Sequence, residues 1–439
     1  MATFSLPALT LPDPQVSGEG ALDPLGLANF ADRLAEEMIP GVRARQNRVR
    51  FVTAIAVAAA VLEDLDDSVG SDGSTTPQLA FEWLLVEGLA RAADPDSYRG
   101  TAGSFKARDA VERQVPMSAK TYLKTPTVFG FHGVYKTLAI DLRVVDRDMR
   151  LDENGRLLVD AWEREQGLAG FVERAIPVDG DSGWNQRLRS AVESALSKGH
   201  TDQAASWAGW KFFATHLGPS TMGRREAKTL FGLLADAEAG TRSEVFRLLE
   251  GARVGGLGDG EIAHRLIAPG ASAALHERVE AIEAYEQFCA ILEYAFDAIR
   301  HAGRDPLRPA SPSDYLPPDG AAVIARLQPA IVRAERALEC LSPSLQTEWG
   351  EIVGAFSAVR SREEVFQAIL GRHHTVQERK PPAGKRDWLE RTTSGDAIVR
   401  PLYRADGPPE LADWWRRPYR LMACLRFTQD IQGAGHGQA

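Results

Sequence analysis

Four arginines stand close together near the N-terminus, with no acidic residue among them. They lie in the run IPGVRARQNRVRF, residues 39–51, and are Arg43, Arg45, Arg48 and Arg50. Guanidinium groups crowded on one segment repel one another unless phosphate or carboxylate oxygens lie nearby. The cluster therefore predicts contact with a nucleic-acid backbone, or else pairing with acidic residues close by in the sequence. Those acidic residues are Asp32, Glu36, Glu37 and Glu63.

A second group of basic residues lies near the C-terminus. From Arg372 to Arg426 there are twelve lysines and arginines and seven acidic residues, a local reversal of the net charge of −9. The residues that crowd around the turn sequence PPAG are Arg372, His373, His374, Arg379, Lys380, Lys385 and Arg386. Such a loop could bind phosphate, with Trp388 stacking on a base. The same cations could instead pair with carboxylates of other domains or of another subunit.

Motifs for metal binding and catalysis do not accompany these residues. His373 and His374 are adjacent, so their side chains diverge on a helix or a strand, and no HxxxH or CxxC sequence occurs. Walker A and GxSxG sequences are also missing. The nearest approach to a nuclease is QERK, residues 377–380, as an extended run that would need a further carboxylate to hold a metal. We predict no catalytic residue, no metal site and no cofactor.

The elements that must position the basic residues are mostly helices. A helix is expected from about Val42 to Leu65, and its apolar stretch from Phe51 to Leu62 is too short to span a membrane, so it should be buried. The clearest helix runs from Ala273 to Ala302, where aromatic and aliphatic residues recur every three or four positions. Minor strand content is expected around residues 374–402.

Residues 121–166 change their periodicity twice. A helical pattern begins at Phe131, the run LRVVDRDMRL has the features of a strand, a turn and a second strand, and Asp152 stands where a helix N-cap is needed. This order resembles the helix, wing and following helix of winged-helix regulators, which bind DNA. The resemblance implies a groove-facing helix and a cationic wing. It places Lys124, His132, Lys136 and Arg143 on or near that helix, and Arg147 and Arg150 on the wing.

The predicted fold is mainly α: a multi-helix bundle with an embedded winged-helix-like module and minor β content. The expected segments are a flexible tail (1–20), an N-terminal helical domain (21–120), the winged-helix-like module (121–166), a helical domain (167–302), a Pro-rich linker (303–320), a helical hairpin (321–370) and a basic C-terminal region (371–439). Cys289, Cys340 and Cys424 are far apart in apolar surroundings, which predicts reduced, buried thiols in a cytoplasmic protein. The N-terminus lacks the pattern of a secretory signal.

The run FADRLAEEMIPGVRARQNRVRF, followed by an apolar helix, resembles the opening of an uncharacterised bacterial family. That family combines a PG break with an arginine-rich helix, and its association with phage-defence gene neighbourhoods implies a subunit of a multi-protein antiviral system. Together the patterns favour a non-enzymatic subunit that binds the DNA or RNA backbone alongside other protein subunits. The alternative is a protein-interaction scaffold without nucleic-acid binding, and the third hypothesis is a metal-dependent nuclease near Glu378 and Lys380.

Overall fold

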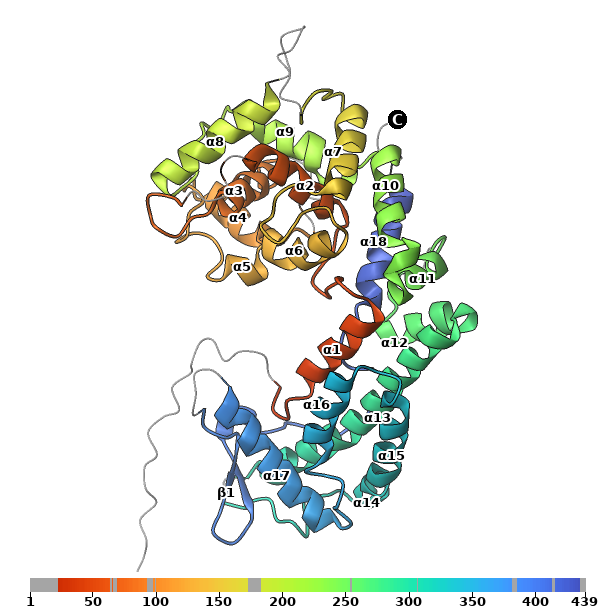
Figure 1. Cartoon of the computed structure of the whole chain (residues 1–439). Coiled ribbons are helices and arrows are strands. Elements are labelled where there is room, and N and C mark those ends of the chain that lie inside the picture. Colours follow the sequence, from red (N-terminus) through yellow and green to blue (C-terminus); the bar gives the residue numbers. More distant parts are fainter. Residues whose placement is uncertain are drawn as a thin grey trace, which may run out of the picture. The chain divides into compact units, whose positions relative to one another are not determined.

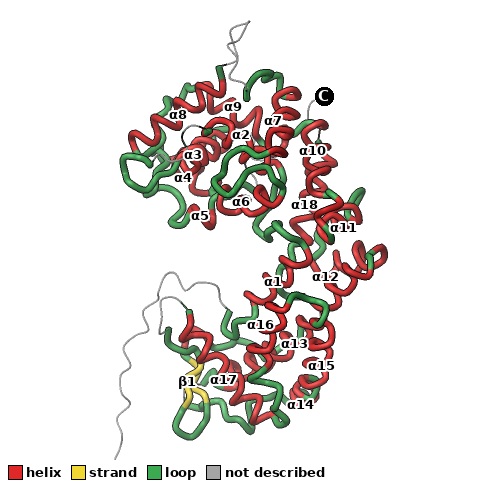
Figure 2. Tube along the Cα trace, viewed as in Figure 1, coloured by secondary structure: helices red, strands yellow, loops and turns green. Residues whose placement is uncertain are grey.

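The protein is mainly helical, as its sequence predicts (Figures 1 and 2). The computed structural model describes residues 23–63, 65, 69–92, 98, 100–172, 183–252, 255–305, 307–380, 385–412 and 415–434. The tail expected at residues 1–20 and the PPAG turn at 381–384 lie outside these described residues. Within them, no helix is long and apolar enough to cross a membrane.

The chain divides into two compact units, each built from separate stretches of sequence. The larger unit contains the described parts of Phe30–Ala290, Gln328–Gly350 and Ala412–Ala439, and the smaller unit those of Met1–Asn29, Ile291–Leu327 and Glu351–Leu411. The first helix, α1 (Ala28–Met38), and the long helix α13 (Ala273–Ala302) contribute residues to both. The bounds predicted for α13 are confirmed.

The core of the larger unit is built around two apolar helices, α2 (Arg50–Leu62) and α3 (Pro77–Ala90). Every residue of α2 is buried, which confirms the burial predicted for residues 51–62. Helix α3 packs against α4 (Ser104–Glu112), α8 (Trp184–Lys198) and α9 (Ala208–Leu217), as Figure 1 shows. This unit also contains α10 (Arg224–Leu234), α11 (Thr241–Leu248), α12 (Asp259–Ile262), most of α15 (Leu327–Leu338), part of α16 (Pro343–Val353), α18 (Leu421–Gly433) and the helices of residues 121–166.

The predicted start of α2 is wrong. The helix begins at Arg50, so Arg43, Arg45 and Arg48 lie in the non-helical segment that precedes it. One local and one tertiary hydrogen bond explain the difference, because the Gln46 amide accepts from the Arg43 backbone N–H (2.9 Å) and donates to the Val134 carbonyl (3.0 Å). These bonds hold the segment in a non-helical path.

Residues 121–166 form helices on either side of a tight turn. Helices α5 (Pro126–Phe129) and α6 (Phe131–Asp141) precede the turn, and α7 (Glu153–Glu165) follows it. The expected strands are reduced to one antiparallel bridge, between Val145 and Leu151. Asp152 is the N-cap of α7, and its side chain accepts from the Glu153 backbone N–H (2.7 Å), as predicted.

The smaller unit combines α14 (Gly320–Ile324) and α17 (Arg362–Arg379) with the antiparallel strands β1 (Leu389–Arg391) and β2 (Ala397–Val399). Leu389 pairs with Val399. Ala310 and Tyr315, from the segment expected as a linker, are both buried in this unit, where Ala310 pairs with Ala397 and Tyr315 contacts Phe366.

Two local expectations are corrected. Residues 377–379 continue α17 and are helical, so QERK is not an extended run. A capping box at Ser361 and Glu364 starts this helix, and the helical periodicity then carries through to Arg379. Cys340 is exposed, whereas Cys289 and Cys424 are buried as expected.

Candidate functional site

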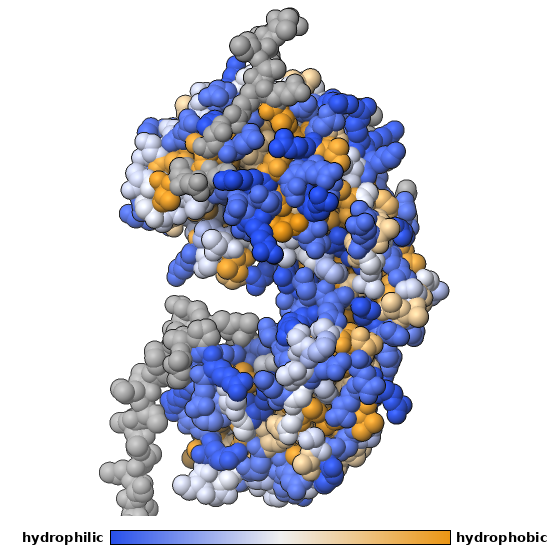
Figure 3. Space-filling model, viewed as in Figure 1, coloured by the Kyte–Doolittle hydropathy of each residue, from blue (hydrophilic) through white to orange (hydrophobic). Residues whose placement is uncertain are grey.

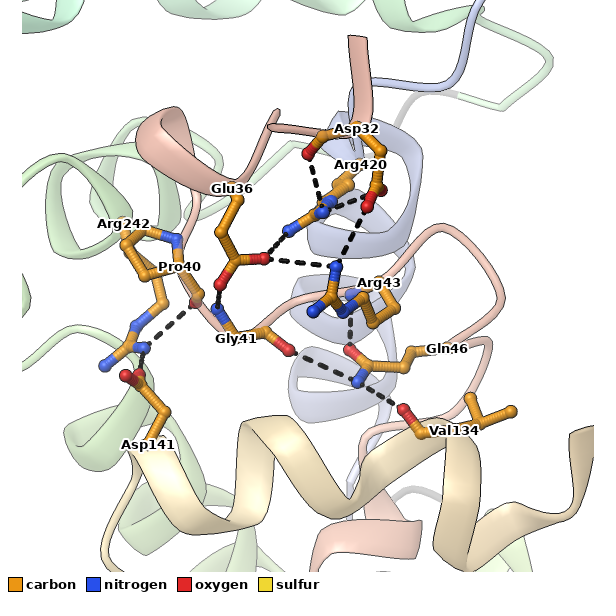
Figure 4. A network of polar contacts seen from close by, with 10 residues as sticks. All are labelled: Asp32, Glu36, Pro40, Gly41, Arg43, Gln46, Val134, Asp141, Arg242 and Arg420. Atoms are coloured by element: carbon orange, nitrogen blue, oxygen red, sulfur yellow. Dashed lines mark hydrogen bonds and ion pairs between the residues drawn. The ribbon is translucent and has the colours of Figure 1, made fainter. Parts of the chain in front are cut away.

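Most arginines of the first cluster form ion pairs with acidic residues of the larger unit. Arg43 pairs with Asp32 (3.1 Å) and Glu36 (3.2 Å), and the buried Arg420 binds the same two carboxylates (Figure 4). Asp32 and Glu36 lie one turn apart on α1, so they present two carboxylates to both guanidinium groups. The local pairing that was the alternative to phosphate contact is therefore present for Arg43.

The other three arginines of this cluster have separate surroundings. Arg48 forms an ion pair with Asp430 (2.8 Å). Arg50 is fully buried, where it pairs with Glu226 (3.1 Å) and donates to backbone carbonyls. Arg45 is exposed, and its guanidinium lies 4.5 Å from the centre of the Phe129 ring. The structure therefore does not bring the four arginines together on one exposed face.

Within the smaller unit, much of the second basic group holds the chain segment at residues 23–26 against α17. Arg372 donates to the Leu25 carbonyl (2.9 Å), and Lys380 donates to the Asp23 carbonyl. His373 is buried between the Pro24 carbonyl and the Trp388 backbone N–H, each 2.9 Å from a ring nitrogen. These contacts are structural.

The remaining members of the second group are more exposed. His374 contacts Asp387 (2.9 Å) and Glu378 (3.4 Å), and Arg386 pairs with Glu390. Arg379 and Lys385 make no ion pair within the described ranges. The expected stacking role of Trp388 is wrong, because its ring is buried and stacks on Tyr403 at 4.2 Å.

The third set of predicted residues does converge. A groove of about 920 Å³ lies between α3, residues 119–127, α6 and the turn at residues 147–150. The predicted residues that line it are Lys124, His132, Lys136, Arg147 and Arg150. Arg143 is not among its lining residues and pairs with Glu153 (2.9 Å).

The rim of the groove is cationic. Lys124, Lys136 and Arg147 are exposed and form no ion pair with any described residue. Asp148 is the one exposed acidic residue among the groove's described lining residues. The face of the larger unit seen in Figure 3 is mostly hydrophilic, with hydrophobic residues in small separate patches. An excess of positive charge around a concave surface favours anionic ligands.

Beneath the rim, Glu82 organises the wall of the groove. Its carboxylate accepts from the Tyr122 hydroxyl (2.6 Å), the backbone N–H groups of Phe131 and His132 (3.1 Å each) and His132 Nδ1 (3.1 Å). Glu82 is 1% exposed, and it satisfies backbone donors at the N-terminus of α6, where a negative charge is favourable. Burial and the neighbouring Glu82 raise the pKa of the Tyr122 hydroxyl well above its usual value, so the hydroxyl remains a donor.

Two glycines make this arrangement sterically feasible. A Cβ at Gly130 would lie 2.1 Å from Glu82 Oε1, and one at Gly103 would lie 2.1 Å from the Tyr122 hydroxyl. Gly103 also has a φ of +81°, in the left-handed region that favours glycine. The close approach of Glu82 and Tyr122 therefore depends on both positions.

The sequence patterns did not identify Glu82 or Tyr122 as parts of the site. A signal was present, because Glu82 interrupts the apolar run LAFEWLLV and a buried carboxylate requires hydrogen-bond donors. Among the described residues, no group of three or more His, Cys, Asp or Glu side chains is placed to hold a metal ion. Comparison with protein-family models, with curated proteins and with solved structures found no match to the chain.

Proposed function

We propose that the protein binds nucleic acid through this groove, as a non-enzymatic subunit of a bacterial multi-protein system. The observation that carries the proposal is the position of Lys124, Lys136 and Arg147. Three exposed cations without an ion pair among the described residues border one concave surface. Phosphate groups are the natural counter-charges for such a rim, and their binding releases condensed counterions.

The dimensions of the groove support a ligand of nucleotide size. Its volume of about 920 Å³ lies within the range of sites that enclose small organic ligands. Leu79, which is half-buried, and Met149, which is 8% exposed, contribute apolar surface to its lining. A phosphate-bearing chain with flat, partly apolar bases matches a cationic rim above such a lining.

Two finer parts of this proposal rest on sequence resemblance. We infer that residues 121–166 act as a winged-helix-like module, with the turn between Val145 and Leu151 as a short wing. The resemblance of residues 30–51 to a bacterial family supports the second inference, that the protein acts in antiviral defence together with other subunits.

A charge-reversal experiment tests the proposal. The triple variant Lys124→Glu, Lys136→Glu, Arg147→Glu should bind labelled single-stranded RNA and DNA at least about tenfold more weakly in an anisotropy assay at low salt. Its plot of log affinity against log salt should also be shallower, by about two phosphate contacts. The matched control is Lys211→Glu, Arg224→Glu, Lys228→Glu, which makes the same charge change at exposed positions outside the groove. Equal weakening by both triple variants would refute the groove as the binding site.

A protein-interaction scaffold remains the second candidate, and one observation favours it. Val128 and Phe129 on α5 are 50% and 45% exposed, immediately after the groove residues Pro126 and Thr127. Exposed apolar side chains beside a groove suit a protein partner. The absence of salt-sensitive binding to either nucleic acid in the assay above would favour this candidate.

A further inference from the structure

An exposed aromatic side chain lies just beyond the cationic groove. Pro126 and Thr127 line the groove, and Phe129 ends the same short helix, α5. Pro126 and Phe129 are three positions apart, so they are neighbours on one side of this helical turn. Phe129 is 45% exposed. A ring that is open to solvent beside a groove is accessible to a ligand that extends out of that groove.

A guanidinium group lies over this ring. The Arg45 guanidinium carbon is 4.5 Å from the centre of the Phe129 ring, within the range of a cation–π contact. Arg45 is exposed and forms no ion pair with any residue that the structure describes. We call these two side chains the Arg45–Phe129 platform. Apolar area alone would suit a protein partner, whereas the added positive charge at the ring favours an anionic ligand.

Helix α6 exposes too little surface to enter the major groove of a duplex. Six of its eleven residues are buried, and three are exposed: Lys136, Thr137 and Asp141. Asp141 pairs with Arg242, and its negative charge would repel phosphate. A helix that reads a duplex inserts an exposed face into the major groove and contacts base edges there. The exposed surface of α6 therefore does not suit a duplex.

A single strand matches both the groove and the platform. Its bases can be splayed out and stacked on aromatic rings and guanidinium planes, while a positively charged groove follows its phosphates. In a duplex, each base is stacked between its neighbours, so proteins contact base edges and phosphates instead. We propose that the groove and the Arg45–Phe129 platform together bind single-stranded rather than duplex nucleic acid, with one base stacked on the platform. This inference rests on the proposed function and names the form of the nucleic acid.

The first test changes only the ligand, so it needs no protein variant. The full chain is titrated in an anisotropy assay with a labelled DNA strand of about sixteen nucleotides, long enough for one single-strand site. The same strand, paired with its complement, is titrated at the same salt concentration. Stacking of one base predicts that the single strand binds at least about fivefold more tightly than the duplex. Equal binding of the two forms, or tighter binding of the duplex, overturns the inference.

A protein variant then assigns the preference to the platform. Phe129→Ala should weaken binding of the single strand at least about fivefold and leave binding of the duplex unchanged, because it removes the stacking surface. Its plot of log affinity against log salt should keep the native slope, because no cation is lost. Native affinity of Phe129→Ala for the single strand would show that the ring takes no part, and the inference would be wrong.

The matched control is Phe105→Ala. Phe105 lies on α4, is 75% exposed and does not line the groove. Removing it takes away an exposed phenylalanine elsewhere on the surface, so this variant should bind both forms as the native protein does. Equal weakening by Phe105→Ala and Phe129→Ala would contradict a stacking site at the platform.

The two proposals fail in different ways. Salt-sensitive binding to both forms without a preference for the single strand removes only this inference. A lack of salt-sensitive binding to either form removes the proposed function as well.

Discussion

The buried His373 should make the smaller unit unstable in mild acid. Burial lowers the pKa of His373 from 6.5 to about 4. Its ring contacts Phe296 and Trp388, while Nδ1 donates to the Pro24 carbonyl and Nε2 accepts from the Trp388 backbone N–H. Protonation would place a donor opposite that N–H and a charge inside the core, so the native ring must remain neutral.

The direction of the effect follows from proton binding. Between the two pKa values the unfolded chain binds a proton at His373 and the native chain does not, so this contribution to stability is present above pH 6.5 and is lost as the pH falls toward 4. For these two pKa values the loss at pH 5, relative to pH 7.5, is about 2 kcal/mol. That is a large fraction of the stability of a small unit.

The assay is urea unfolding at pH 5 and pH 7.5, followed by hydrogen exchange of peptides from α17 so that the smaller unit is observed separately. His373→Gln removes the titrating group and should reduce the difference in unfolding free energy between the two pH values by about 2 kcal/mol. The neighbouring His374→Gln is the control, because His374 is exposed and contacts carboxylates. If His373→Gln keeps the full pH dependence of the native protein, the argument from burial is wrong.

Three further predictions concern single side chains. Glu82→Ala should lower the free energy of unfolding by about 3 kcal/mol or more in urea titrations, because it leaves buried donors unpaired, whereas Glu82→Gln, which keeps an acceptor, should cost less. Gly103→Ala should lower the free energy of unfolding by more than about 2 kcal/mol, because the new Cβ would clash with Tyr122 and the residue has a φ of +81°. The control Gly167→Ala has a φ of +69° but no atom within 4 Å of the new Cβ, so it should lower the free energy of unfolding by only about 1 kcal/mol. Equal losses of stability in thermal unfolding would contradict the steric argument. A thiol-specific reagent should label only Cys340, the exposed cysteine, in the native protein. Labelling should be slow near neutral pH, because partial desolvation and the nearby Glu277 raise the pKa of that thiol. Mass spectrometry showing a second labelled cysteine would oppose this prediction.

Periodicity and composition were sufficient to predict two helices, α2 and α13, from the sequence. Every residue of α2 is buried and most are apolar, and α13 repeats apolar residues every three or four positions along its length. The local sequence pattern alone therefore predicts that both segments are helical. The start of α2 was not predictable in the same way. The path of residues 43–49 depends on Gln46 binding the Val134 carbonyl, a partner 88 positions away.

Whether each basic residue is paired or exposed depends even more on partners that are distant in the sequence. That cations gather in three segments of an acidic chain can be read from the composition of those segments. The pairing of Arg48 with Asp430 and of Arg50 with Glu226, and the exposure of Lys136 on a groove, depend on the folded chain. An ion pair requires a separation of a few ångströms in space, and the order of residues along a chain does not specify that separation.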